Sequence, residues 1–182
     1  MIDLSERYRK TSESLRLAMD RESANLARKA GVSSVRLASG DALGSWCIRA
    51  PEGDIARFAI LYLPNCGAVA VLCDCLVEPQ YRRNGIASAL HDIRIAAARD
   101  AGATVALCTV LIGNRPMRAI LRAHHWKVAI GPFYNPATDS WICLYWLNLA
   151  IEKRTEASWR VWLARIKSRI HHQPDKWGGA LP

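Results

Sequence analysis

The sequence lacks paired metal-binding cysteines, long apolar runs and internal repeats. Its six cysteines form no C-x-x-C pair, so we expect no metal site and reduced thiols, as in cytoplasmic proteins. They are Cys47, Cys66, Cys73, Cys75, Cys108 and Cys143. No apolar stretch reaches the ~20 residues that cross a bilayer. The first 20 residues carry charges throughout, so we expect neither a membrane span nor a signal peptide.

Acidic residues are also scarce, since 16 Asp and Glu stand against 25 Lys and Arg, giving a formal net charge of +9. Such an excess favours an anionic partner, for example nucleic acid, a phosphorylated cofactor or an acidic surface. Many soluble enzymes are basic as well, so charge alone does not choose among these partners. A hydrophobic fraction of 51% is enough for a sizeable core in one domain.

Apolar periodicity predicts alternating helices and strands along the chain. We expect helices at 5–30, 85–101, 114–123 and 152–170, and strands at 33–38, 45–50, 57–63, 68–77, 104–111, 126–134 and 141–149. The strand–helix–strand unit at 68–111 implies a parallel pair with a right-handed crossover. Hairpins on either side imply antiparallel neighbours. The predicted fold is therefore a mixed α/β sheet, mostly antiparallel around a central parallel pair, with helices on both faces and extra terminal helices.

A basic, glycine-containing turn joins the strand at 68–77 to the next helix. It contains Arg82, Arg83 and Gly85. Gly85 lacks a Cβ, so a ligand can approach the backbone closely. The first turn of a helix has unpaired N–H groups at the positive end of the helix dipole. This junction could bind a phosphate or pyrophosphate, although an ordinary solvated loop has the same composition.

The segment VEPQYRRNGIASAL, which begins at Val77, resembles the acyl-CoA-binding motif of the GNAT superfamily, the Gcn5-related N-acetyltransferases. That motif has the form Q/R-x-x-G-x-G/A after V-x-P, and here it is Arg82-x-x-Gly85-x-Ala87. The family's second signature is matched outright only at Asn114. The resemblance covers residues 57–149 and implies a GNAT-like domain within 1–150, with acetyl-CoA as acyl donor and an amine as acceptor.

The resemblance also implies which residues bind the donor. Leu76 and Val77, at the splayed end of their strand, would pair with the pantetheine and polarise the thioester carbonyl, and Asn114 would lie beside the pantetheine. The pyrophosphate would be bound by the turn that contains Arg82, Arg83, Asn84, Gly85, Ile86, Ala87 and Ser88.

Asp74, Tyr134 and Tyr145 are the candidates for acid–base catalysis. Asp74 is a lone carboxylate in an apolar strand, where burial would suit it as the base that deprotonates the amine. A structural carboxylate is the equal alternative. Leu121 stands at the place of the tyrosine that often serves this family as general acid. Tyr134 and Tyr145 could replace it, or could simply be packing aromatics. His124 and His125 could act as a base or acid near the acceptor, or could be surface residues at a helix end stabilised by the helix dipole.

Residues 151–182 are predicted to form a basic amphipathic helix and a loose tail. Trp159, Trp162, Ile166 and Ile170 lie on one stripe among arginines and a lysine. The stripe could dock on the domain or bind nucleic acid or another partner. We therefore expect an N-acetyltransferase whose acceptor is a small molecule, a protein or an amine carried on nucleic acid. A homodimer is possible, and the alternative function is a catalytically inactive GNAT-fold binding module.

Overall fold

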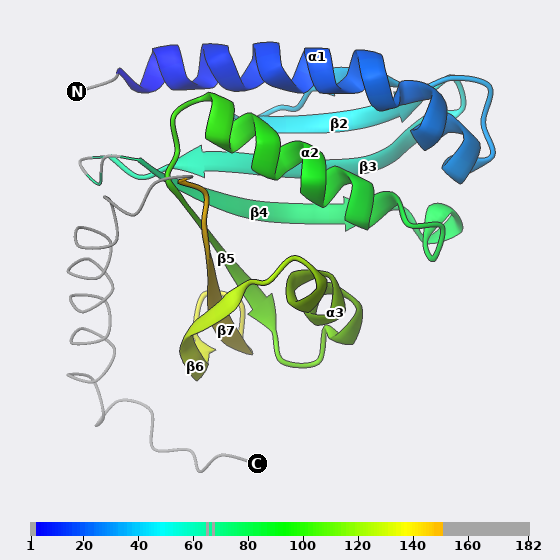
Figure 1. The fold of residues 1–182 in the computed structure, drawn as a ribbon. Helices are drawn as coiled ribbons and strands as arrows, with labels where there is room; N and C mark the ends of the chain where they lie inside the picture. Colours follow the sequence, from blue (N-terminus) through cyan, green and yellow to red (C-terminus); the bar gives the residue numbers. More distant parts are fainter. Residues whose placement is uncertain (1–2, 65, 67, 151–182) are drawn as a thin grey trace.

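The computed structural model describes residues 3–64, 66 and 68–150, which form three helices, a short 3₁₀ turn and a seven-stranded sheet (Figure 1). The helices are α1 (Leu4–Ala30), α2 (Ile86–Asp100) and α3 (Arg115–Ala123), and the 3₁₀ turn η1 is Pro79–Tyr81. The strands are β1 (Arg36–Ser39), β2 (Ser45–Ala50), β3 (Gly53–Tyr62), β4 (Val69–Val77), β5 (Val105–Leu111), β6 (Lys127–Asn135) and β7 (Ser140–Asn148).

The sheet has the strand order β1-β2-β3-β4-β5-β7-β6. Every neighbouring pair is antiparallel except β4 and β5, which are parallel and joined through α2. The predicted mixed sheet with one central parallel pair is therefore confirmed. The third strand begins at Gly53 rather than at residue 57, because Gly53 and Asp54 already pair with β2 despite their polar character.

Helix α1 is one continuous helix of 27 residues. Leu15, Met19 and Leu26 form its buried stripe, and it packs mainly along α2. It ends at Gly31, whose left-handed φ of 69° lets its N–H bond the Arg28 carbonyl. Neither α1 nor another helix in the described part of the chain is both long and apolar enough to cross a membrane.

Apolar side chains are buried on both faces of the sheet. The larger cluster includes Leu15, Leu90 and Leu121, one from each described helix, so these three helices lie on the same face, whereas the sequence predicted helices on both faces. The smaller cluster consists of Val69, Val105, Leu107 and Leu144, whose side chains alternate with those of the larger cluster. The predicted C-terminal helix at 152–170 and the tail after it lie outside the described residues.

Strands β4 and β5 separate soon after they begin, and this separation creates the site. Only Val69, Ala70 and Val71 of β4 pair with β5. From there β5 runs away from β4, while α3 lies beside the far end of β5 (Figure 1). The second half of β4 therefore has an edge whose N–H and C=O groups are not used by a neighbouring strand on that side.

Candidate active site

A cavity of about 640 Å³ occupies the space beside the free half of β4. It is bordered by the end of β4, the η1 turn, the start of α2 and one side of α3. The lining residues are Cys75, Leu76, Val77, Tyr81, Arg82, Arg83, Gly85, Ile86, Ala87, Ser88, Asn114, Pro116, Met117 and Ile120. Nine of the ten residues predicted to bind the cofactor are brought together here, and the tenth, Asn84, lies within the same turn.

The start of α2 points a row of backbone donors into this cavity. Gly85 is the N-cap residue, with a left-handed φ of 74°, and no side chain caps the helix. Arg83, two residues earlier, is also left-handed, with φ 66°. Helix geometry leaves the N–H groups of the first turn without intrahelical partners, and the helix dipole makes this end positive. An uncapped helix start of this kind is suited to an anion such as a pyrophosphate.

Three cations surround the uncapped start of α2. Arg82 donates from Nε to the Val77 carbonyl at 2.8 Å, so its guanidinium is held beside the end of β4. Arg83 is exposed at the cavity wall. Lys29, from the last turn of α1, places its ammonium 3.5 Å from the Gly85 carbonyl. Sequence reasoning missed Lys29, because no local signal connects two residues separated by 56 positions.

Helix α3 supplies the apolar side of the cavity. Asn114 is its N-cap, and the Asn114 side chain accepts a hydrogen bond from the Met117 N–H at 3.1 Å. Pro116, Met117 and Ile120 line the cavity from this helix. The cavity thus has a cationic, N–H-rich end and an apolar side, which suits a ligand with a phosphorylated head and a long, weakly polar arm.

Strand β4 contains a β-bulge at the cavity. Ala59 pairs with Cys73 and Arg57 pairs with Leu76, so Phe58 alone faces both Asp74 and Cys75. Asp74 has a left-handed φ of 52° and is exposed. The expectation that Asp74 is buried within the strand is therefore wrong, because the bulge breaks the regular alternation of side chains on which that expectation depended.

A second cavity, of about 560 Å³, lies on the other side of the bulge. It is lined by Ser39, Gly40, Asp41, Ala42, Ser45, Trp46, Cys47, Arg49, Asp54, Arg57, Phe58, Ala59, Asp74, Cys75 and Leu76. Asp54 pairs with Arg49 at 2.6 Å, whereas Asp74 has no ion pair among the described residues. Cys75 and Leu76 line both cavities, so the two cavities meet at the bulge.

The tyrosines considered as general acids lie away from this meeting point. Tyr145 is 7% exposed in the main core, and Leu121 is fully buried there. Tyr134 donates a hydrogen bond to Asp139, which raises the Tyr134 pKa above its usual value. Neither tyrosine lines the two cavities. Asp139 instead borders a third hollow of about 530 Å³, which Trp141 and Asn114 also line.

The histidines at the end of α3 belong to a separate cluster. His124 lies 3.2 Å from Asp92 and packs against His91 of α2, with 4.8 Å between the ring centroids. His91 accepts a hydrogen bond from the Trp126 indole at 2.9 Å. Burial and the nearby Arg94 cation lower the His91 pKa to about 3. Neither His124 nor His125 lines the first or second cavity.

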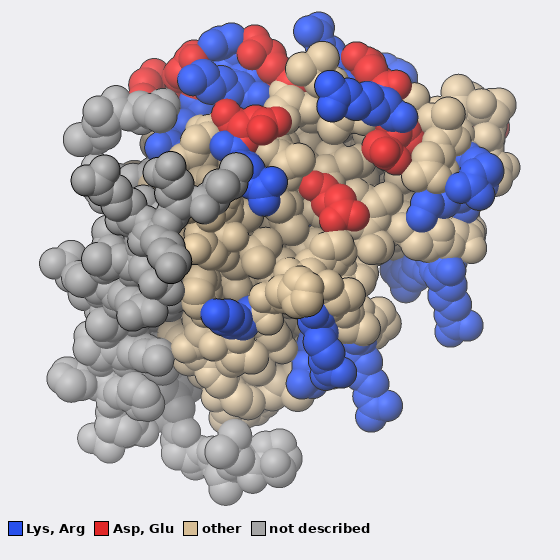
Figure 2. Space-filling model, viewed as in Figure 1, with Lys and Arg blue, Asp and Glu red and all other residues tan. Residues whose placement is uncertain are grey.

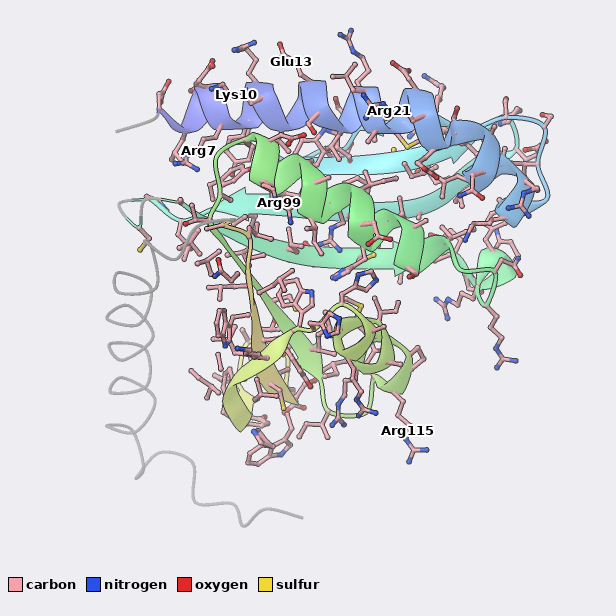
Figure 3. The ribbon with its side chains drawn as sticks, in the orientation of Figure 1. Arg7, Lys10, Glu13, Arg21, Arg99 and Arg115 are labelled. Carbon is pink, nitrogen blue, oxygen red and sulfur yellow. The ribbon has the colours of Figure 1, made fainter. Side chains whose placement is uncertain are left out.

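Charge is distributed unevenly over the visible face. Acidic side chains lie among Lys and Arg over α1 and α2, whereas in the lower part, over α3 and the strands beside it, the visible charged side chains are all Lys or Arg (Figure 2). Arg115, at the first position of α3, reaches into solvent from this region (Figure 3). The basic region adjoins the helix that borders the first cavity, so a phosphorylated ligand would approach a positive surface.

Comparisons with known proteins agree with this geometry. A family model described as "Acetyltransferase (GNAT) family" matches residues 6–126. The chain therefore belongs to the GNAT acetyltransferase family, and the matched range includes α1. No curated protein matches the chain.

Several solved structures share the fold. Nourseothricin acetyltransferase is 19% identical with a TM-score of 0.50, and the match covers 58% of this chain and 65% of that one. The ribosomal-protein-S18-alanine N-acetyltransferase from Escherichia coli is 16% identical, with a TM-score of 0.50 and coverages of 61% and 72%. Ard1 from Thermoplasma volcanium is 13% identical, with a TM-score of 0.52 and coverages of 70% and 77%. The chain thus spans less than two thirds of the first of these proteins, and identities this low establish the fold alone.

Proposed function

We propose that this protein is an acyl-CoA-dependent N-acyltransferase that moves an acetyl group from acetyl-CoA to a primary amine. The observation that carries the proposal is the meeting of two cavities at Cys75 and Leu76. The first has the uncapped helix start and the cations that a pyrophosphate needs. The second is open and is lined by apolar as well as charged side chains, and Asp74 lies on its wall.

In the proposed complex, the pyrophosphate binds at the N–H groups of residues 83–88, with Lys29 as an additional cation. The pantetheine follows the free edge of β4 at Leu76 and Val77, with Asn114 beside it. This route brings the thioester to the bulge, where the second cavity begins. A neutral amine in the second cavity can then attack the thioester carbon directly.

The reaction forms a C–N bond and breaks the C–S bond, so CoA leaves as a thiolate. We propose that Asp74 accepts the proton that the amine must lose. Tyr134 and Tyr145 line neither cavity, so we do not assign them the role of acid. A thiol of this kind has a pKa near 8.5, which makes the thiolate a tolerable leaving group without one.

The test is turnover of acetyl-CoA with a panel of amines that contains amino acids, polyamines, aminoglycosides and peptides with free N-termini. Acetylated product is identified by mass spectrometry, which avoids interference from the protein's own thiols. Product that depends on both the enzyme and one class of amine supports the proposal. If no amine is acetylated and acetyl-CoA does not bind, the chain is instead a binding module with a GNAT fold.

A further inference from the structure

Arg94, in the middle of α2, is a buried cation whose partners are two backbone carbonyl groups. It is 1% exposed and forms no ion pair with any carboxylate in the described part of the chain. Its Nη2 donates to the Cys73 carbonyl at 2.9 Å and to the Ala59 carbonyl at 3.1 Å. Its Nε has no hydrogen-bond partner among residues 3–64, 66 and 68–150. Burying a guanidinium without a counter-ion is unfavourable, so the burial of Arg94 needs a specific explanation.

The two carbonyl groups belong to the last regular pair before the bulge in β4. Ala59 and Cys73 face each other, and beyond them Phe58 faces two residues. A bulge interrupts the ladder of hydrogen bonds between strands and leaves backbone groups in need of partners. Hydrogen bonds from a charged donor are stronger than those from a neutral one. One guanidinium nitrogen therefore joins β3 to β4 where the ladder opens. The Phe58 ring, 5.7 Å from the guanidinium carbon, packs against the same cation.

The bulge determines how the two cavities face each other. Asp74 adopts a left-handed conformation, with a φ of 52°, which is unfavourable for residues other than glycine. The same residue lines the second cavity, and the next two residues line both. A small shift of the bulge would move the proposed base and the strand edge that contacts the thioester.

We propose that Arg94 is a positioning residue for acyl transfer, which holds the β4 bulge so that the thioester and Asp74 face each other. This inference rests on the proposed function. Arg94 acts from the helix face of the sheet and touches no substrate. Its role is to tie the backbone just before Asp74 to β3, through two bonds from one planar group. Lysine would retain the charge, but its rotatable ammonium on a flexible stem would not fix the two N–H directions as the planar guanidinium does.

The first test measures the thioester itself. Acetyl-CoA labelled with ¹³C at the carbonyl is bound to the wild-type protein and to Arg94→Met, and the carbonyl chemical shift is compared by NMR. We expect the wild-type protein to move this shift from its value in water, and Arg94→Met to bring it back toward that value. The dissociation constant for acetyl-CoA should change by less than about threefold, since the start of α2 is retained.

Arg99→Met is the matched control. Arg99 lies on the same helix and also donates to a backbone carbonyl, that of Leu149 at 3.2 Å, but it lines neither cavity (Figure 3). If Arg94 only stabilised the fold, both variants would lower the melting temperature and leave the bound carbonyl shift unchanged. An unchanged shift in folded Arg94→Met would therefore overturn the proposal. With an active acceptor, kcat should fall by about 10²-fold and KM for acetyl-CoA should not rise.

Arg94→Lys keeps the proposal testable if the methionine variant does not fold. We expect kcat to fall in Arg94→Lys and to be retained in Arg99→Lys. Wild-type kcat in Arg94→Lys would overturn the proposal. If the wild-type protein did not bind acetyl-CoA, the proposed function would fail separately. Amide hydrogen exchange at residues 74–76 would then decide the role of Arg94. Faster amide exchange in Arg94→Lys than in Arg99→Lys would show that Arg94 fixes the backbone of the bulge, and equal exchange would exclude that role.

Discussion

Substitution of Gly85 by glutamate probes the cofactor cavity most sharply. Gly85 has a left-handed φ of 74°, and any residue with a Cβ pays about 1–2 kcal/mol in that conformation. A carboxylate about 4 Å from one unit of phosphate charge adds roughly 4 kcal/mol of repulsion at an effective dielectric constant of 20. A Cβ at this position would lie 3.0 Å from the Lys29 ammonium, so the new carboxylate would also draw Lys29 away from the phosphate.

We therefore expect Gly85→Glu to weaken acetyl-CoA binding by roughly 10³-fold, the equivalent of about 4 kcal/mol. Isothermal titration calorimetry measures the affinity, and circular dichroism confirms that the variant is folded. Gly31→Glu is the matched control, because Gly31 has nearly the same φ, 69°, and lines none of the cavities. Both variants should lose similar stability. If folded Gly85→Glu bound acetyl-CoA within about threefold of the wild-type affinity, the location of the pyrophosphate would be wrong.

Three further predictions concern the base, the added cation and the buried histidine. Asp74→Asn should lower kcat by about 10²-fold with unchanged acetyl-CoA affinity, and turnover within a factor of about two would make Asp74 structural. Lys29→Ala should weaken acetyl-CoA binding about tenfold and make the affinity less dependent on salt. Calorimetry at two ionic strengths measures both changes, and neither would be seen if Lys29 made no phosphate contact. His91 stays neutral in the folded protein, with a pKa of about 3, but binds a proton in the unfolded chain below about pH 6.5. The stabilisation from keeping His91 neutral is therefore fully present above pH 6.5 and is lost as pH falls toward 3. In denaturant melts, the free energy of unfolding should be about 2 kcal/mol lower at pH 5 than above pH 6.5, and His91→Gln should largely remove this loss.

Local signals in the sequence predicted much of the fold and of the cofactor cavity. The turn at Gly85 depends on residues close together in the chain, and it is found as predicted. The strand–helix–strand unit likewise follows from one apolar strand, one helix and one buried strand in succession. The end of α2 also has a local cause, since Gly102 has a positive φ and its N–H donates to the Arg99 carbonyl.

Features that depend on pairing between distant segments could not be predicted in the same way. The bulge at Asp74 appears only when β3 and β4 are aligned, because the sequence of β4 alone suggests regular alternation. Lys29 reaches the cavity from another helix. The burial of Arg94, in contrast, had a signal that was overlooked. Ile93 and Arg94 follow Leu90 by three and four residues, the spacing of one helix face, which places Arg94 on the buried stripe of α2.

Binding of acetyl-CoA in the cavity beside β4 underlies every other proposal for this protein. Calorimetric titration of acetyl-CoA into the wild-type protein, with the Gly85→Glu variant titrated in parallel under the same conditions, measures it. We expect saturable binding of one molecule per chain in the wild type and loss of binding in the variant. A titration without heat in the wild type, confirmed by equilibrium dialysis, would show that this cavity does not bind acetyl-CoA.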